Sequence, residues 1–143
     1  MKSTIHSRTG QYVAVGAQTG VMSASPHQLI EMLLEGAISK IAMAKGAMQR
    51  EQIEQKGELI TKASSIIMGL RSSLDMEAGG EVAQNLDELY GYMAQRLLDA
   101  HINNEISALD EVSNLLREIK HGWDAIANQN SDKKPVFEVA NSE

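Results

Sequence analysis

The chain has 143 residues, of which 43% are hydrophobic, 22% charged and 3% aromatic, and its formal net charge is -6. This length suits one domain, and the composition is typical of a soluble globular protein. The chain contains no Cys, which excludes disulfide bonds, thiolate metal sites and a Cys nucleophile.

The charge pattern argues against a nucleic-acid partner. The 13 basic residues are scattered among 19 acidic ones, whereas a nucleic-acid-binding surface needs a basic patch to neutralise phosphates. The first residues lack an apolar segment of the kind a signal peptide needs, and the uncharged stretch before residue 30 is too polar to span a bilayer. We therefore expect a cytoplasmic protein with no direct membrane insertion.

The first expected helix has a well-defined start. Ser25 is suited to the N-cap, Pro26 to the first helical position, and Gln28 completes a capping box. Apolar residues then recur at helical spacing, which predicts a helix ending near Gln49. This stripe consists of Ile30, Leu33, Leu34, Ala37, Ile41, Ala44 and Met48.

Three more segments have helical periodicity. The second has its stripe from Ile53 to Leu74 and is expected to stop before Gly79-Gly80, a turn signal. The third has a core-facing stripe from Val82 to Ala100 that includes Tyr90. The fourth has its stripe from Ile106 to Ile126, which includes Trp123, and Asn103-Asn104 separates these two segments. Helices of similar length with short connections pack antiparallel. The sequence therefore predicts an all-α protein, an up-down-up-down four-helix bundle.

The ends of the chain differ in composition from the bundle, which is expected over residues 25–128. Residues 1–24 are rich in Gly, Ser and Thr and are expected to form a flexible arm that carries an apolar patch at Tyr12, Val13 and Val15. Residues 129–143 are polar and are expected to be a disordered tail.

Residues suited to catalysis or metal binding are few. A di-iron bundle needs two Glu-x-x-His pairs, and this sequence has one, Glu118 with His121. His27 and His101 are interpreted as surface residues, and no Gly-rich phosphate loop is present. We expect no enzyme activity, no catalytic or metal site and no cofactor.

The helices carry more apolar residues than a bundle core needs, since about three positions in seven suffice. A second apolar stripe on a small protein must be covered, either by a wider core seam or by a partner. The eight Met residues favour a surface that adapts to an apolar partner, although they also fill core gaps. The expected partner-binding residues are Leu29, Met32, Met43, Leu59, Ile66, Met68, Leu98 and Leu115.

Four blocks of the sequence together resemble the FliS family of flagellar export chaperones. The first is residues 21–37, VMSASPHQLIEMLLEGA, with a Tyr about a dozen residues before its Ser-Pro, here Tyr12. The others lie within residues 62–75, 79–93 and 111–123. The resemblance covers about residues 12 to 126. Leu34 departs from it, because the family often has Tyr or Phe there.

The resemblance implies a function. Family members are antiparallel four-helix bundles that bind the disordered C-terminal segment of flagellin in the cytoplasm, prevent its premature polymerisation and deliver it to the export gate protein FlhA. Some also bind the anti-sigma factor FlgM. The resemblance implies that the arm, with Tyr12, Val13 and Val15, caps the flagellin groove or docks to FlhA. The alternative is a regulatory or adaptor bundle that dimerises through its second apolar stripe.

Overall fold

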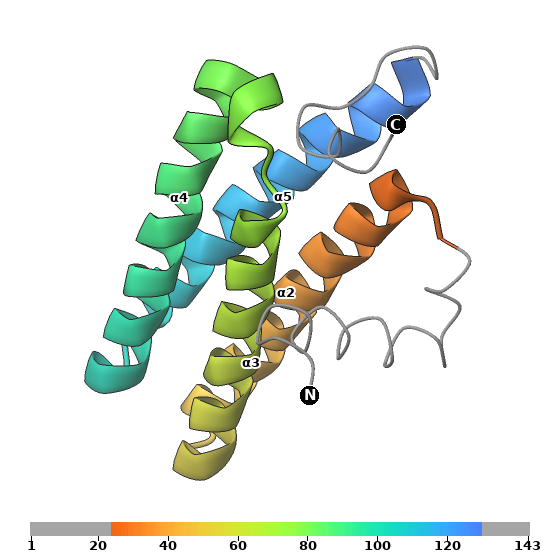
Figure 1. Ribbon diagram of the computed structural model, residues 1–143. Coiled ribbons are helices and arrows are strands. Elements are labelled where there is room, and N and C mark those ends of the chain that lie inside the picture. The colour runs from red at the N-terminus through yellow and green to blue at the C-terminus, as the bar shows by residue number, and fades with distance from the viewer. Residues whose placement is uncertain (1–23, 130–143) are drawn as a thin grey trace, which may run out of the picture.

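The computed structural model describes residues 24–129, which fold into four α-helices. These are α2 (Pro26–Gln49), α3 (Ile53–Ser72), α4 (Met76–Asn103) and α5 (Ile106–Gln129). Figure 1 shows that consecutive helices alternate in direction, and the described residues contain no strand. The predicted antiparallel bundle is confirmed for this part of the chain. The expected arm and tail, including Tyr12, Val13 and Val15, lie outside the described residues apart from Ala24 and Gln129.

The helices form a closed ring. Helix α2 packs against α3 and α5, and α4 packs against the same two helices from the other side. The core between them is apolar, and its largest fully buried side chains include Trp123, Tyr90, Leu34 and Met93. Leu34, at the position where the family often has an aromatic residue, therefore shapes the core. None of the helices among residues 24–129 is both long enough and apolar enough to cross a membrane.

The predicted start of α2 is confirmed. The Ser25 backbone N–H donates to Gln28 Oε1 at 2.9 Å, and the Gln28 N–H donates to Ser25 Oγ at 3.1 Å. Pro26 occupies the first turn, where the missing N–H costs no helical hydrogen bond. These contacts fix the point at which the chain enters the bundle.

The connection between α3 and α4 differs from the prediction. Helix α3 ends at Ser72, and α4 begins at Met76 because the Asp75 side chain accepts hydrogen bonds from the N–H groups of Glu77 and Ala78. The Gly79-Gly80 signal marks a kink inside α4, where Gly80 has φ 53° and ψ -128°. The helical phase changes there, which leaves Val82 exposed, although it was expected in the core.

A buried lysine joins α3 to the end of α4. Lys56, 4% exposed, donates from Nζ to the carbonyl oxygen of His101 at 3.1 Å and to Oδ1 of Asn104. Asn104 adopts a left-handed conformation with φ 53° and ends the helix. Lys56 thus satisfies acceptors at the α4 C-terminus, a role that apolar periodicity does not reveal.

Candidate functional site

An open groove runs between α3 and α4. Its α4 wall is mostly apolar, whereas its α3 wall is built largely from small hydroxyl side chains. The residues that line it are Ile60, Thr61, Ser64, Ser65 and Met68 on α3 and Ala94, Leu97, Leu98 and His101 on α4. Residues spaced three and four apart share one face of a helix, so each wall is a stripe along its helix.

Two further hollows extend the groove toward the start of α3. The first contains Thr61 and His101 again, together with Ile53, Gly57 and three charged residues, Glu54, Glu58 and Lys62. The second shares Ile53 and passes between α3 and the start of α5, where Ile106 lines it. From Ile53 to Met68 the surface follows α3 for about 22 Å at 1.5 Å per residue.

Apolar side chains along this path are exposed to solvent. Leu98 is 48% exposed and Ile53 is 71% exposed. Ile53 was expected in the core, but it is the first residue of α3, and its side chain is exposed there. The small walls at Ser64, Ser65 and Ala94 allow another backbone to approach closely. The surface therefore suits a partner helix with an apolar face.

His101 lies where the first two hollows meet. Its ring passes over Gly57 of α3, and a Cβ at Gly57 would lie 3.0 Å from His101 Cε1. Gly57 is thus needed to let the imidazole lie against α3. The Nδ1 atom of His101 is buried and has no hydrogen-bond partner within residues 24–129.

The structure brings two of the eight predicted partner-binding residues into this groove, Met68 and Leu98. On α2, Met43 is exposed, while Leu29 and Met32 are half-buried. Ile66 packs at the seam between α2 and α3, where its Cδ1 lies 3.6 Å from the Cβ position of Gly36.

The last two predicted residues belong to the core or its edge. Leu59 is 7% exposed and belongs to the core, and Leu115 is half-buried against it. The predicted second stripe is therefore not one continuous surface, because a shift of one helical position moves a side chain from surface to core.

Sequence reasoning missed most of the α3 wall. Thr61, Ser64 and Ser65 are polar and Ala94 is small, so a search for large apolar residues passes over them. Their signal is the recurrence of small residues on one face of the helix: Gly57, then Thr61 one turn later, then Ser64 and Ser65 one turn after Thr61. Such a row on a helix surface indicates a place where a neighbour comes close.

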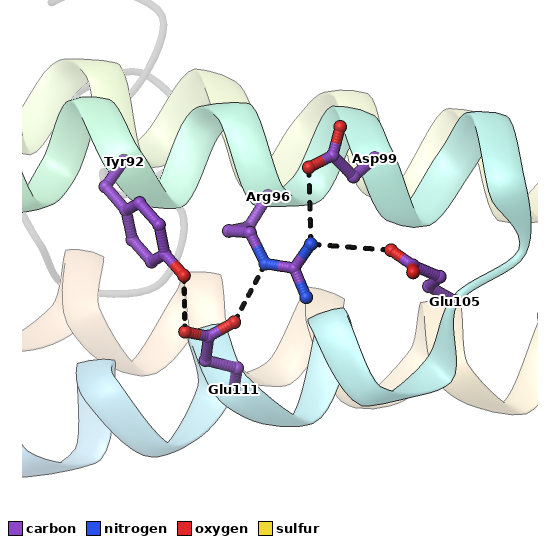
Figure 2. A network of polar contacts seen from close by, with 5 residues as sticks. All are labelled: Tyr92, Arg96, Asp99, Glu105 and Glu111. Carbon is purple, nitrogen blue, oxygen red and sulfur yellow. Dashed lines mark hydrogen bonds and ion pairs between the residues drawn. The ribbon is translucent and has the colours of Figure 1, made fainter.

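The opposite side of α4 is occupied by a polar network with α5 (Figure 2). Arg96 donates from Nε to Glu111 Oε1 at 2.8 Å and pairs through Nη1 with Asp99 at 3.2 Å and Glu105 at 3.4 Å. The Tyr92 hydroxyl donates to Glu111 Oε2 at 2.6 Å. Hydrogen bonds from Tyr92 and Arg96 lower the pKa of Glu111, while the bond to Glu111 raises the pKa of Tyr92. These contacts hold this side of α4 against α5.

A second polar cluster lies between α2 and α5. Lys120 pairs with Asp124 at 2.8 Å and with Glu35 at 3.5 Å, and Glu31 lies 4.0 Å away. The hydrogen bond from Lys120 lowers the pKa of Asp124, while burial and the neighbouring Asp124 carboxyl raise the pKa of Glu31. Within residues 24–129, no group of three or more His, Asp or Glu side chains is arranged to hold a metal ion. The cluster is read as an ion-pair contact between helices.

Together, these observations describe a small helical bundle with an open groove between α3 and α4. A family model described as "Flagellar protein FliS" matches residues 8–130. The chain belongs to the FliS family, which is a chaperone family and not an enzyme family.

Curated relatives cover most of the chain. It is 53% identical over 118 residues to the flagellar secretion chaperone FliSB of Pseudomonas aeruginosa, which covers 82% of this chain and 94% of that protein. It is 47% identical over 117 residues to the flagellar secretion chaperone FliS of Salmonella typhimurium, covering 81% and 87%. The FliS of Vibrio cholerae is 44% identical over 115 residues, covering 80% and 85%. The predicted resemblance and the role as a flagellar export chaperone are confirmed.

Proposed function

We propose that this chaperone acts in the cytoplasm by holding the C-terminal segment of flagellin as a helix in the groove between α3 and α4. Covering that segment keeps flagellin from polymerising early. The complex is then delivered to the export gate protein FlhA. The observation that carries this proposal is the uncovered surface from Ile53 to Met68, with Leu98 exposed on its α4 wall.

The chemistry of the groove supports a helical client. A segment that is disordered alone folds when it binds, and an apolar stripe laid in a groove contributes most of the binding energy. The walls combine exposed Leu98 with the small side chains of Ser64 and Ala94. A client helix with apolar residues one turn apart and small residues between them fits such walls.

The choice of client comes from the family. The relatives are named flagellar secretion chaperones, which supports a flagellar protein as the cargo, and the sequence resemblance implies that the bound part is the C-terminal segment of flagellin.

For the arm we propose that Tyr12, Val13 and Val15 cap the flagellin groove, dock to FlhA, or do both. Tyr12→Ala should weaken docking to FlhA or change the affinity for flagellin. If neither quantity changes, Tyr12 has no part in either step.

Isothermal titration tests the client directly. The protein is titrated with intact flagellin and with flagellin lacking its last ~40 residues, about the reach of two bundle-length helices. Binding to the intact form alone supports the proposal. Binding to neither form overturns it.

Two matched variants test the groove. Leu98→Gln should weaken flagellin binding about tenfold, because it places a polar group at the centre of an apolar contact. Val82→Gln is the control, since Val82 is 51% exposed, close to the 48% of Leu98, but lies outside the groove on the same helix. Equal affinities for both variants would place the client elsewhere.

The rival is an adaptor bundle in which a second copy covers the groove. It predicts a stable homodimer that Leu98→Gln dissociates, measurable by light scattering in the absence of flagellin. A monomer at micromolar concentration removes this alternative.

A further inference from the structure

The groove contains one polar side chain whose position is fixed by its neighbours, His101. The hydroxyls of Thr61, Ser64 and Ser65 are able to turn toward carbonyl oxygens of their own helix. The His101 ring has no such option, because it lies between α4 and the backbone at Gly57. Its hydrogen-bonding direction is therefore set before any partner arrives.

The environment of the two ring nitrogens selects a tautomer. Nδ1 is buried without a partner among the described residues, whereas Nε2 is not buried and has no hydrogen bond within them. A buried N–H without an acceptor is rarer in proteins than an under-used acceptor. The neutral ring therefore carries its proton on Nε2, the atom able to reach a partner.

The charges near His101 restrict which kind of acceptor this N–H can donate to. The adjoining hollow is lined by Glu54 and Glu58 but by only one base, Lys62. The groove on the other side of His101 has no charged side chain in its lining. The ammonium group of Lys56 lies 3.1 Å from the His101 carbonyl oxygen, so the two carboxylates near His101 are balanced by two ammonium groups. Because no net positive charge is present to offset the desolvation of a carboxylate, a neutral oxygen is the favoured acceptor.

We infer that His101 is the polar anchor of the groove: its Nε2–H donates a hydrogen bond to a neutral oxygen acceptor of the bound helix. That acceptor is a side-chain amide or hydroxyl, flanked by apolar residues that contact Leu98 and Met68 on one side and Ile53 on the other. The inference rests on the proposed function. The apolar walls supply affinity without direction, and one oriented donor fixes the register of the helix.

The test compares two substitutions in the full-length chain by titration with a peptide of the last ~40 residues of flagellin, the reach of two bundle-length helices. His101→Phe keeps an aromatic ring over Gly57 but removes the donor, and should weaken binding about 3- to 10-fold. His101→Gln retains an N–H donor and should stay within about twofold of the wild type. If His101→Phe binds as tightly as the wild type, the anchor is absent.

Binding of the flagellin peptide by the wild type distinguishes a failure of this inference from a failure of the proposed function. No binding of the wild type refutes the proposed function, whereas equal binding by the wild type and His101→Phe refutes the anchor alone. Titrations in low and high salt test whether the acceptor is neutral. The ratio of the wild-type affinity to the His101→Phe affinity should be the same at both salt concentrations. A ratio that falls steeply with salt identifies a charged acceptor and contradicts the assignment.

A spectroscopic measurement keeps the inference testable if His101→Phe unfolds. In the wild type, the imidazole Nε2–H of His101 exchanges rapidly with water until an acceptor protects it. Addition of the flagellin peptide should bring its proton signal into view in a nitrogen-edited NMR spectrum. Binding of the peptide without that signal would overturn the inference.

Discussion

The indole Nε1–H of Trp123 donates a 2.9 Å hydrogen bond to the carbonyl oxygen of His27, and the two rings stack with centroids 4.3 Å apart and planes 6° apart. Trp123 lies near the end of α5, and His27 lies in the first turn of α2. This pair closes the ring of helices at the end of the bundle where the described chain begins and ends.

Trp123→Phe should destabilise the fold while preserving the aromatic contact. The substitution removes the N–H donor and leaves the His27 carbonyl without this partner, a loss of about 1–2 kcal/mol. Denaturant unfolding measures the free energy directly. Trp123→Ala, which also leaves a cavity, should cost about 3–5 kcal/mol. A Trp123→Phe variant with the same free energy of unfolding as the wild type would show that the hydrogen bond contributes nothing.

Lys56→Met should destabilise the bundle by about 2 kcal/mol. It removes a charged donor from the His101 carbonyl and from Asn104, and hydrogen bonds to charged groups contribute about 1.5–3 kcal/mol. Lys62→Met, an exposed position on the same helix, is the control. If both variants unfold at the same urea concentration, Lys56 does not stabilise the end of α4.

The Glu111 network gives the stability a defined pH dependence. Its pKa in the fold lies below the ordinary value of 4.5, because Tyr92 and Arg96 donate to it. The unfolded chain thus binds more protons between the two pKa values, so stability is present above pH 4.5 and is lost as pH falls below it.

Glu111→Gln should therefore flatten the acid limb of the stability curve. Urea unfolding from about pH 7 to about pH 3 measures the slope. Glu118→Gln removes an exposed carboxylate from the same helix without touching the network and serves as control. A Glu111→Gln curve with the slope of the wild type would contradict the prediction.

Two glycines should respond to alanine in opposite directions. Gly80→Ala should cost more than about 1 kcal/mol, because its φ of 53° disfavours any side chain even though a Cβ would meet nothing within 4 Å. Gly122→Ala should stabilise by up to about 1 kcal/mol, since it lies inside α5 with equally open space. Thermal unfolding compares the two, and a stabilised Gly80→Ala would show that the kink relaxes without cost.

Periodicity predicted the helices well, because a helix with one buried face has apolar residues at regular intervals in the sequence. Tyr90 and Trp123 were both placed in the core correctly. The α3–α4 connection was predicted wrongly because the Gly79-Gly80 pair outweighed the cap at Asp75. An acidic cap begins a helix even where no glycine ends the previous one.

The candidate site was harder to predict than the fold. A groove is defined by the side chains that two helices fail to cover, and this depends on their mutual orientation. Leu59 and Leu98 have the same type of side chain, yet one is buried and the other exposed. His101 and Gly57 become meaningful only as a pair, since nothing in sequence relates positions on different helices.

The closed ring of helices also has a kinetic consequence. Three of its four seams join helices that are consecutive in the chain, whereas the seam between α2 and α5 joins residues 96 positions apart at Trp123 and His27. Closing a long loop costs more chain entropy than closing a short one. We expect this seam to form last during folding and to open first in native-state hydrogen exchange, before the pair of helices that forms the groove separates.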